Sequence, residues 1–101
     1  MAFRIVETST RPTTDIDWYR FPEDEITYMG MLVAEKKLDM WSTSTHDRLS
    51  ETWTLTYTNK EDMDAVNNNP EFVASSVARN DYNLKHGITL ESSLEEIQLY
   101  R

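Results

Sequence analysis

The chain has 101 residues, a length that suits one domain and is short for two. Its 18 acidic and 10 basic side chains give a formal net charge of −8, which argues against binding to nucleic acid or to an anionic membrane surface. Cysteine is absent, so disulfides, thiolate nucleophiles and cysteine-based metal sites are excluded.

The hydropathy of the chain predicts, by default, a cytoplasmic protein. No apolar run reaches the ~18 residues of a membrane span, and the first residues lack the apolar stretch of a signal peptide. Apolar side chains make up 39% of the chain, below the ~45–50% usual in globular domains. A half-exposed sheet would strain this balance, and pairing with a second copy is one way to relieve it.

The first third of the chain predicts a strand, a loop and a helix. Residues 2–9 alternate as a strand does, and residues 11–22 form an ordered loop, because their aromatic side chains would be unfavourable in water. Proline and three acidic residues then favour a helix over 22–38. The apolar face of this helix is expected to carry Ile26, Met29, Val33 and Lys37, with Leu32 beside it.

The middle of the chain predicts a hairpin. Residues 51–58 are the clearest strand, because threonine alternates there with Trp53, Leu55 and Tyr57. Residues 40–46 are the weaker partner strand, and 47–50 form the turn.

Two helical pieces and a last strand follow. Asn59 suits the cap of a short helix over 60–66, and Pro70 begins a second helix that runs to His86 and ends at Gly87. A strand begins near residue 88, and residues 93–101 are left as an acidic tail of undetermined conformation. The second helix is expected to turn one apolar face to the core, made of Val73, Val77, Asn80 and Leu84 and flanked by Ala74 and Asp81.

This order predicts a single α+β domain over 1–101, with ferredoxin-like βαββαβ topology and a four-stranded antiparallel sheet. Right-handed crossovers would place both helical segments on one face of the sheet. The other face would carry either the threonine row or the row of Trp53, Leu55 and Tyr57. A bare sheet face in a small domain is a natural place for a partner copy.

The element order and the stretch from Trp53 to Val66, followed by Asn69-Pro70-Glu71-Phe72, resemble the dimeric α+β barrel proteins. This group includes the antibiotic-biosynthesis-monooxygenase-type domains. The resemblance implies a homodimer whose two sheets pack face to face, with clefts between helices and sheet that hold small apolar or aromatic molecules. The group includes cofactor-free oxygenases, haem-degrading enzymes and ligand-responsive domains, and no functional residue of these is transferred to this chain.

Aromatic and methionine side chains give the strongest functional signal, because they suit an irregular apolar pocket. A packed core and a dimer interface account for the same side chains more readily than a ligand cavity does. The ligand-binding residues predicted on this basis are Trp18, Tyr28, Met29, Trp41, Trp53, Tyr57, Phe72 and His46.

Catalytic and metal-binding patterns are weak. His86 lies at a helix end, where a positive charge suits the helix dipole, and neither it nor His46 has metal-ligand spacing, so no metal or cofactor is expected. Three hypotheses remain open: a homodimeric domain that binds a small apolar or amphipathic ligand, a cofactor-free monooxygenase-like enzyme acting on an aromatic substrate, and a structural or interaction protein without a ligand.

Overall fold

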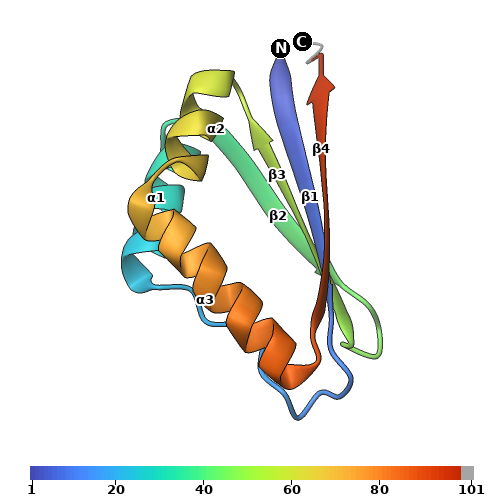
Figure 1. The fold of residues 1–101 in the computed structure, drawn as a ribbon. Coiled ribbons are helices and arrows are strands. Elements are labelled where there is room, and N and C mark those ends of the chain that lie inside the picture. The colour runs from blue at the N-terminus through green and yellow to red at the C-terminus, as the bar shows by residue number, and fades with distance from the viewer. Residues whose placement is uncertain (99–101) are drawn as a thin grey trace.

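The computed structural model describes residues 1–98, which form an α+β domain (Figure 1). The described chain runs through four strands and three helices in the order βαββααβ. The elements are β1 (Ala2–Thr10), α1 (Glu23–Ala34), β2 (Leu38–Ser44), β3 (Ser50–Tyr57), α2 (Lys60–Asn67), α3 (Pro70–His86) and β4 (Thr89–Ile97). The predicted α+β class and the division of the second helical segment into two pieces are confirmed.

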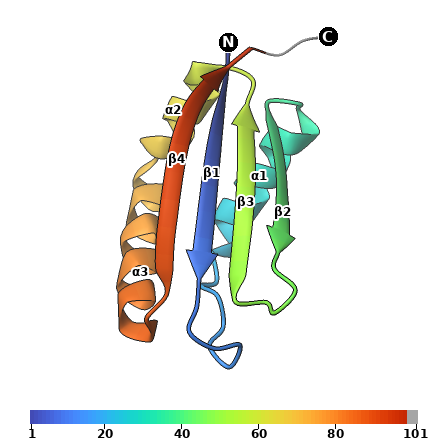
Figure 2. The same cartoon turned by 90° about the vertical axis from the view of Figure 1, so that its right-hand side faces the viewer.

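The four strands form one antiparallel sheet in the order β2-β3-β1-β4. The register places Ile5 of β1 opposite Leu55 of β3 and Leu94 of β4. All three described helices lie on one side of the sheet, and Figure 2 looks onto the opposite side. The sheet therefore has a helix face and an open face.

The core lies between the helices and the sheet. Tyr57 of β3 is 1% exposed and packs with Leu38 of β2 and with Leu32 of α1. Helices α2 and α3 complete this cluster with Met63, Val66 and Phe72. The row of Trp53, Leu55 and Tyr57 thus faces the helices, which decides between the two predicted orientations of β3.

The open face carries the threonine row. The Thr8 and Thr52 hydroxyls lie 3.0 Å apart on adjacent strands, and Arg4 Nε donates to Thr56 Oγ1 at 3.4 Å. Thr54 and Thr56 are nevertheless buried, because their neighbours on the flanking strands cover them.

Short polar side chains and one glycine fix the ends of α2 and α3; the roles of Asn59, Pro70 and Gly87 were predicted, and that of Asn69 was not. Asn59 Oδ1 accepts a hydrogen bond from the Asp62 amide at 3.0 Å, which caps α2. Asn69 caps α3 in the same way, with proline in its first turn. Gly87 ends α3 in the left-handed conformation, with φ of 72°.

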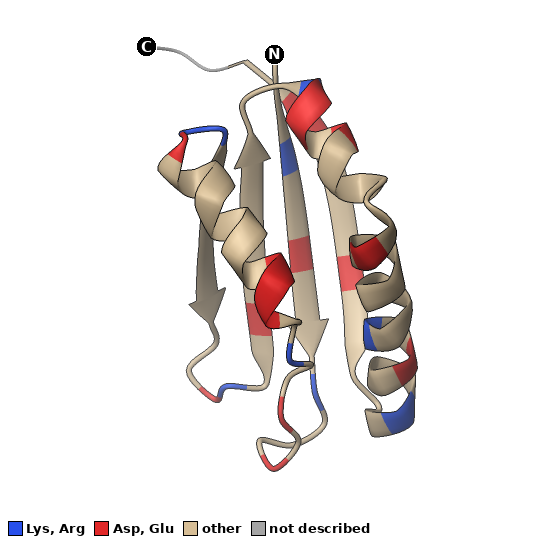
Figure 3. Ribbon diagram, turned by 90° about the vertical axis from the view of Figure 1, so that its left-hand side faces the viewer, with Lys and Arg blue, Asp and Glu red and all other residues tan. Residues whose placement is uncertain are grey.

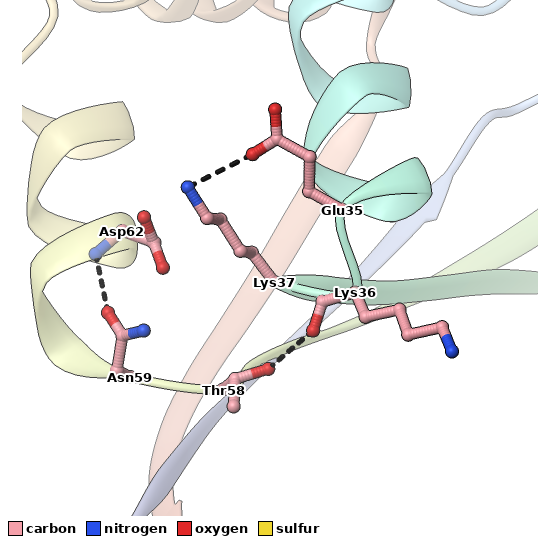
Figure 4. Close-up of polar contacts among 6 residues, drawn as sticks. All are labelled: Glu35, Lys36, Lys37, Thr58, Asn59 and Asp62. Atoms are coloured by element: carbon pink, nitrogen blue, oxygen red, sulfur yellow. Dashed lines mark hydrogen bonds and ion pairs between the residues drawn. The ribbon is translucent and has the colours of Figure 1, made fainter.

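Helix α1 ends at Ala34, several residues before the predicted end at residue 38. The amide of Lys37 donates to the carbonyl of Leu32 at 2.9 Å, and Lys36 adopts a φ of 60°, so a Schellman turn closes the helix. Thr58 Oγ1 donates to the Lys36 carbonyl at 3.0 Å and joins this turn to the end of β3 (Figure 4). The sequence contains no glycine at this turn, which is why the prediction was wrong.

Lys37 adds an ion pair to this turn. Its Nζ lies 3.0 Å from Glu35 Oε2, and this hydrogen bond raises the pKa of Lys37 (Figure 4). Both side chains are close to half exposed, so the pair contributes little to stability.

The predicted face of α1 is right for Met29 and for Leu32 beside it, which belong to or pack against the core, and wrong for its other residues. The predicted face of α3 is wrong. In α1 the buried residue is Leu32, whereas Ile26 is 58% exposed and Val33 is also exposed. In α3 the expected face points to solvent, because Val73, Val77, Asn80 and Leu84 are all exposed. The buried residues of α3 are Phe72, Ser75 and Asn83.

The last strand continues into the segment for which no conformation was predicted. Strand β4 runs to Ile97, which lies opposite Ala2 of β1. Residues 99–101 of the expected tail lie outside the described residues. Within residues 1–98, the helices are too short or too polar to cross a membrane.

Candidate ligand site between the helices and the sheet

Four polar side chains lie in the layer between helices and sheet, and we call them the interlayer cluster: Glu7, Glu25, Ser75 and Arg79. Glu7 follows Phe3 and Ile5 on the helix face of β1, so the strand alternation directs a carboxylate inward. Ser75 and Arg79 are one helical turn apart on the inward face of α3.

An ion pair across the layer joins β1 to α3. Arg79 Nη2 lies 2.9 Å from Glu7 Oε2, and the two side chains are only 20% and 22% exposed. The Arg79 guanidinium also lies 5.5 Å from the ring centre of Phe21, at the end of the loop that leads into α1. The ion pair therefore holds two of the four residues of the interlayer cluster, Glu7 and Arg79, in place.

Three side-chain atoms of the cluster are shielded from solvent and have no hydrogen-bond partner among residues 1–98: Glu25 Oε2, Ser75 Oγ and Arg79 Nε. We call them the three shielded polar atoms. A buried polar group without a partner costs about 1–3 kcal/mol, so folded proteins leave few of them. The three atoms come from α1 and α3, the two helices that meet through Tyr28 and Phe72.

Aromatic side chains surround the cluster. The rings of Tyr28 and Phe72 meet edge to face with their centres 5.2 Å apart. Burial raises the pKa of the Tyr57 hydroxyl to about 12, and the negative charges of Glu7 and Glu25 act in the same direction. The cluster thus lies in an apolar, weakly hydrated surrounding in which electrostatic interactions are strong.

A hollow of about 230 Å³ opens between the starts of α1 and α3. Glu25 and Phe72 belong both to this hollow and to the interlayer region described above, so the hollow leads toward the cluster. Acidic residues colour the start of α1 in Figure 3. The lining residues are Pro22, Asp24, Glu25, Glu71 and Phe72.

A second, more open hollow of about 340 Å³ lies where the end of α1 meets the sheet. Its polar lining is mostly exposed, and Thr56, which is buried, is already hydrogen-bonded to Arg4. It therefore lacks the shielded polar atoms of the interlayer cluster. The lining residues are Arg4, Val33, Lys36, Leu38, Asp39, Thr56 and Thr58.

The structure brings together four of the eight predicted ligand-binding residues and places a fifth on the same face of the sheet. Tyr28, Met29, Tyr57 and Phe72 belong to or pack against the core cluster beside the interlayer cluster. Trp53 lies on the same sheet face, where its indole N–H donates to Glu51.

The other three predicted residues lie elsewhere. Trp41 is on the open face of edge strand β2 and is 52% exposed. His46 is exposed in the connection between β2 and β3. Trp18 packs under the Arg11 guanidinium, 4.4 Å from the ring centre, in the loop before α1.

Sequence reasoning missed all four residues of the interlayer cluster. Glu7 had a signal, because it interrupts an otherwise apolar alternation after Phe3 and Ile5. No sequence signal pointed to Ser75 or Arg79, because the direction of their side chains depends on the rotation of α3 about its axis.

Within residues 1–98, no group of three metal-ligating side chains is placed to hold a metal ion. Comparisons of the chain with models of protein families, with curated proteins and with solved structures give no match. The structure supports a small α+β domain with an antiparallel sheet, and the likeness to the dimeric α+β barrel proteins remains a prediction.

Proposed function

We propose that this chain is a ferredoxin-like domain that forms a homodimer of the dimeric α+β barrel type. In this proposal each copy binds a small amphipathic ligand between its helices and its sheet. The observation that carries the proposal is the set of three shielded polar atoms beside an aromatic layer. The sheet order β2-β3-β1-β4 supports the ferredoxin-like assignment if α2 and α3 together are counted as the second crossover.

The chemistry of the layer fits a ligand with one polar end and an apolar body. Glu25 Oε2 can accept a hydrogen bond, Arg79 Nε can donate one, and Ser75 Oγ can do either. The edge-to-face pair of Tyr28 and Phe72 offers the apolar contact. Binding would satisfy polar groups that folding leaves without partners.

The open face supports the dimer. Trp41 is 52% exposed on this face, and Val6 and the threonine methyl groups lie beside it. A second copy packed on this face would bury the indole ring and cover the mixed apolar surface. Such a contact is isologous, because both copies would use the same face.

The enzyme alternative has weaker support. A cofactor-free oxygenase needs an acid–base group that points at its substrate, and His46 is exposed in a turn. His86 packs against the Tyr82 ring at 4.3 Å between centres, at the end of α3. We therefore favour binding without catalysis.

Native mass spectrometry of the purified protein tests both parts of the proposal. We expect a dimer that carries an added mass, and this mass should be lost under denaturing conditions. Trp41→Glu replaces the exposed indole of the open face by a charge and should give a monomer, whereas Thr43→Glu at the exposed edge of the same face should leave the dimer intact.

The two parts of the proposal can fail separately. A wild-type monomer would refute the dimer. A dimer that carries no added mass and binds no amphipathic molecule from a screen of amines, alcohols and carboxylic acids would refute the ligand site and favour a structural role.

A further inference from the structure

We infer that the hollow between the starts of α1 and α3 binds a small organic cation, an ammonium group carried on an apolar body. This inference rests on the proposed function, because it names the ligand class of the same site. Four features of the hollow lead to this inference. Its lining is negatively charged, Glu25 has a shielded oxygen without a hydrogen-bond partner among residues 1–98, its wall is aromatic, and Asn69 already accepts hydrogen bonds from amides at the start of α3.

The lining of the hollow is negative. Asp24, Glu25 and Glu71 supply three carboxylates, and no lysine or arginine of the described chain is among the lining residues. A carboxylate ligand would meet like charges here, whereas an ammonium group would meet opposite charges. The formal charge of −8 on the whole chain acts in the same direction.

Favourable interactions with the helix dipoles explain the presence of Asp24 and Glu71 in the hollow, but they do not explain why an oxygen of Glu25 is shielded from solvent. Asp24 and Glu71 are exposed and lie in the first turns of α1 and α3, where negative charge is favourable. Glu25 differs because its Oε2 is shielded from solvent and accepts no hydrogen bond from residues 1–98. An ammonium N–H is the donor that suits such an oxygen, since both partners are charged.

A second shielded acceptor lies on the inward face of α3. Ser75 is 5% exposed, its Oγ finds no partner within the described chain, and it follows the lining residue Phe72 on this helix. A primary ammonium has three N–H groups, so it can donate to Glu25 and to further acceptors as well.

The wall of the hollow is aromatic. Phe72 lines the hollow and contacts Tyr28 edge to face. The faces of such rings attract cations, and their apolar surface suits the body of the ligand. The volume of about 230 Å³ lies below the ~300–1,000 Å³ of pockets for drug-sized molecules, which points to a small amine.

The start of α3 does not offer its amides to an anion. The Glu71 amide donates to Asn69 Oδ1 at 3.0 Å, and the Phe72 amide donates to the Asn69 carbonyl at 3.0 Å. Because the cap already uses these donors, the usual reason for anion binding at a helix start is removed.

Titration calorimetry with three probes of the same shape tests the inference. The probes are phenethylamine, which is a cation at neutral pH, the neutral phenethyl alcohol and the anion phenylacetate. We expect the amine to bind the wild-type protein at least about tenfold more tightly than the alcohol, and phenylacetate to bind more weakly than both.

Two matched variants locate the site. Glu25→Gln keeps the shape of the side chain and should remove most of the preference for the amine over the alcohol. Asp24→Asn removes an exposed charge from the same rim and should lower the amine affinity by no more than about threefold. Amide chemical shifts of the wild-type protein with phenethylamine should change at Glu25, Phe72 and Ser75.

The outcomes separate this inference from the proposed function. If the alcohol binds as tightly as the amine, the pocket stands and the cation preference is refuted. The same conclusion follows if Glu25→Gln keeps the preference while its amide spectrum shows a folded protein. If no probe binds but native mass spectrometry still detects a bound mass, the ligand class is wrong and the proposed function survives.

Discussion

Left-handed backbone at single residues ends two of the helices. Gly87 closes α3 with φ of 72°, and Lys36 closes α1 with φ of 60°. A side chain in this conformation costs roughly 1–2 kcal/mol, which glycine avoids. Lys36 is tolerated because the Schellman hydrogen bonds and the Thr58 hydroxyl hold its peptide groups.

Gly87→Ala should lower the free energy of unfolding by about 1–2 kcal/mol, because alanine disfavours this φ. Steric overlap contributes little, since the new Cβ would lie 3.7 Å from Pro12 Cγ. The matched variant Gly30→Ala should raise stability by up to ~1 kcal/mol, because Gly30 lies inside α1 and, outside the backbone of this helix and the adjacent residues, no atom of residues 1–98 lies within 4 Å of the new Cβ. Urea denaturation measures both, and equal effects of the two variants would contradict the argument.

Loss of the Tyr57 hydroxyl proton at alkaline pH should lower the free energy of unfolding. Its pKa is raised to about 12 in the folded chain against a reference value of 10.0, so the folded state holds the proton more tightly than the unfolded state. The associated stability is fully present below about pH 10 and is lost as pH rises toward about 12.

A spectroscopic titration of tyrosinate absorbance should show a step near pH 12 that Tyr57→Phe removes. The Phe variant should also lose less stability between about pH 10 and 12 than the wild type does. A titration curve that retains this step in the variant would assign it to another tyrosine.

At the scale of elements, helix α3 presents polar residues inward and apolar residues outward. Ser75 and Asn83 are buried, whereas Leu84 is 84% exposed. Ser75 and Arg79 are the α3 residues of the interlayer cluster, so the rotation that looks unfavourable for packing is the one that makes the candidate site. Phe72 supplies the apolar anchor through its contact with Tyr28.

Two alanine substitutions on α3 test this rotation. Phe72→Ala removes a buried ring and should cost about 3–5 kcal/mol. Leu84→Ala removes an exposed side chain and should change stability by less than about 0.5 kcal/mol. Chemical denaturation of both variants measures the difference, and a larger loss at Leu84 would show that α3 is turned the other way.

At the scale of the whole molecule, the Glu7–Arg79 pair ties the helix layer to the sheet. The pair joins residues 72 positions apart in the sequence, and its burial contrasts with the exposed pair of Arg4 and Glu95, whose atoms are 3.8 Å apart. An unpaired charge between the helices and the sheet is unfavourable. Breaking the Glu7–Arg79 pair should therefore lower the free energy of unfolding more than breaking the Arg4–Glu95 pair.

Arg79→Ala should lower the free energy of unfolding by about 1–3 kcal/mol, because Glu7 then remains partly buried without its partner. Arg4→Ala should lower it by no more than about 0.5 kcal/mol. Thermal denaturation at low and high salt should show little salt dependence for the Arg79 effect, and equal losses would mean that the interlayer pair is well solvated.

The sequence predicts local structure well where one residue type determines the backbone. The alternation of threonine and aromatic residues marks β3, and Asn59, Pro70 and Gly87 mark the ends of α2 and α3. The end of α1 was not predicted because Lys36 adopts the left-handed backbone conformation that is usually adopted by glycine.

Tertiary contacts decide what the sequence leaves open. Helix α3 has apolar residues on both sides, so periodicity alone favours the wrong face, and its contact through Phe72 selects the other. For the same reason the aromatic part of the candidate site was predicted, through Tyr28 and Tyr57, whereas the partners Glu7 and Arg79 were not.

The strand order has a consequence for aggregation, because it leaves β2 and β4 as the two edges of the sheet. Strand β4 carries Glu91, Glu95 and Glu96, whose charges oppose pairing with another chain, whereas Asp39 is the single charged residue of β2. Strand β2 is therefore the edge at which we expect another chain to pair and β-rich polymers to start. Thr43→Lys adds a positive charge to this edge and should slow polymer formation in an aggregation assay.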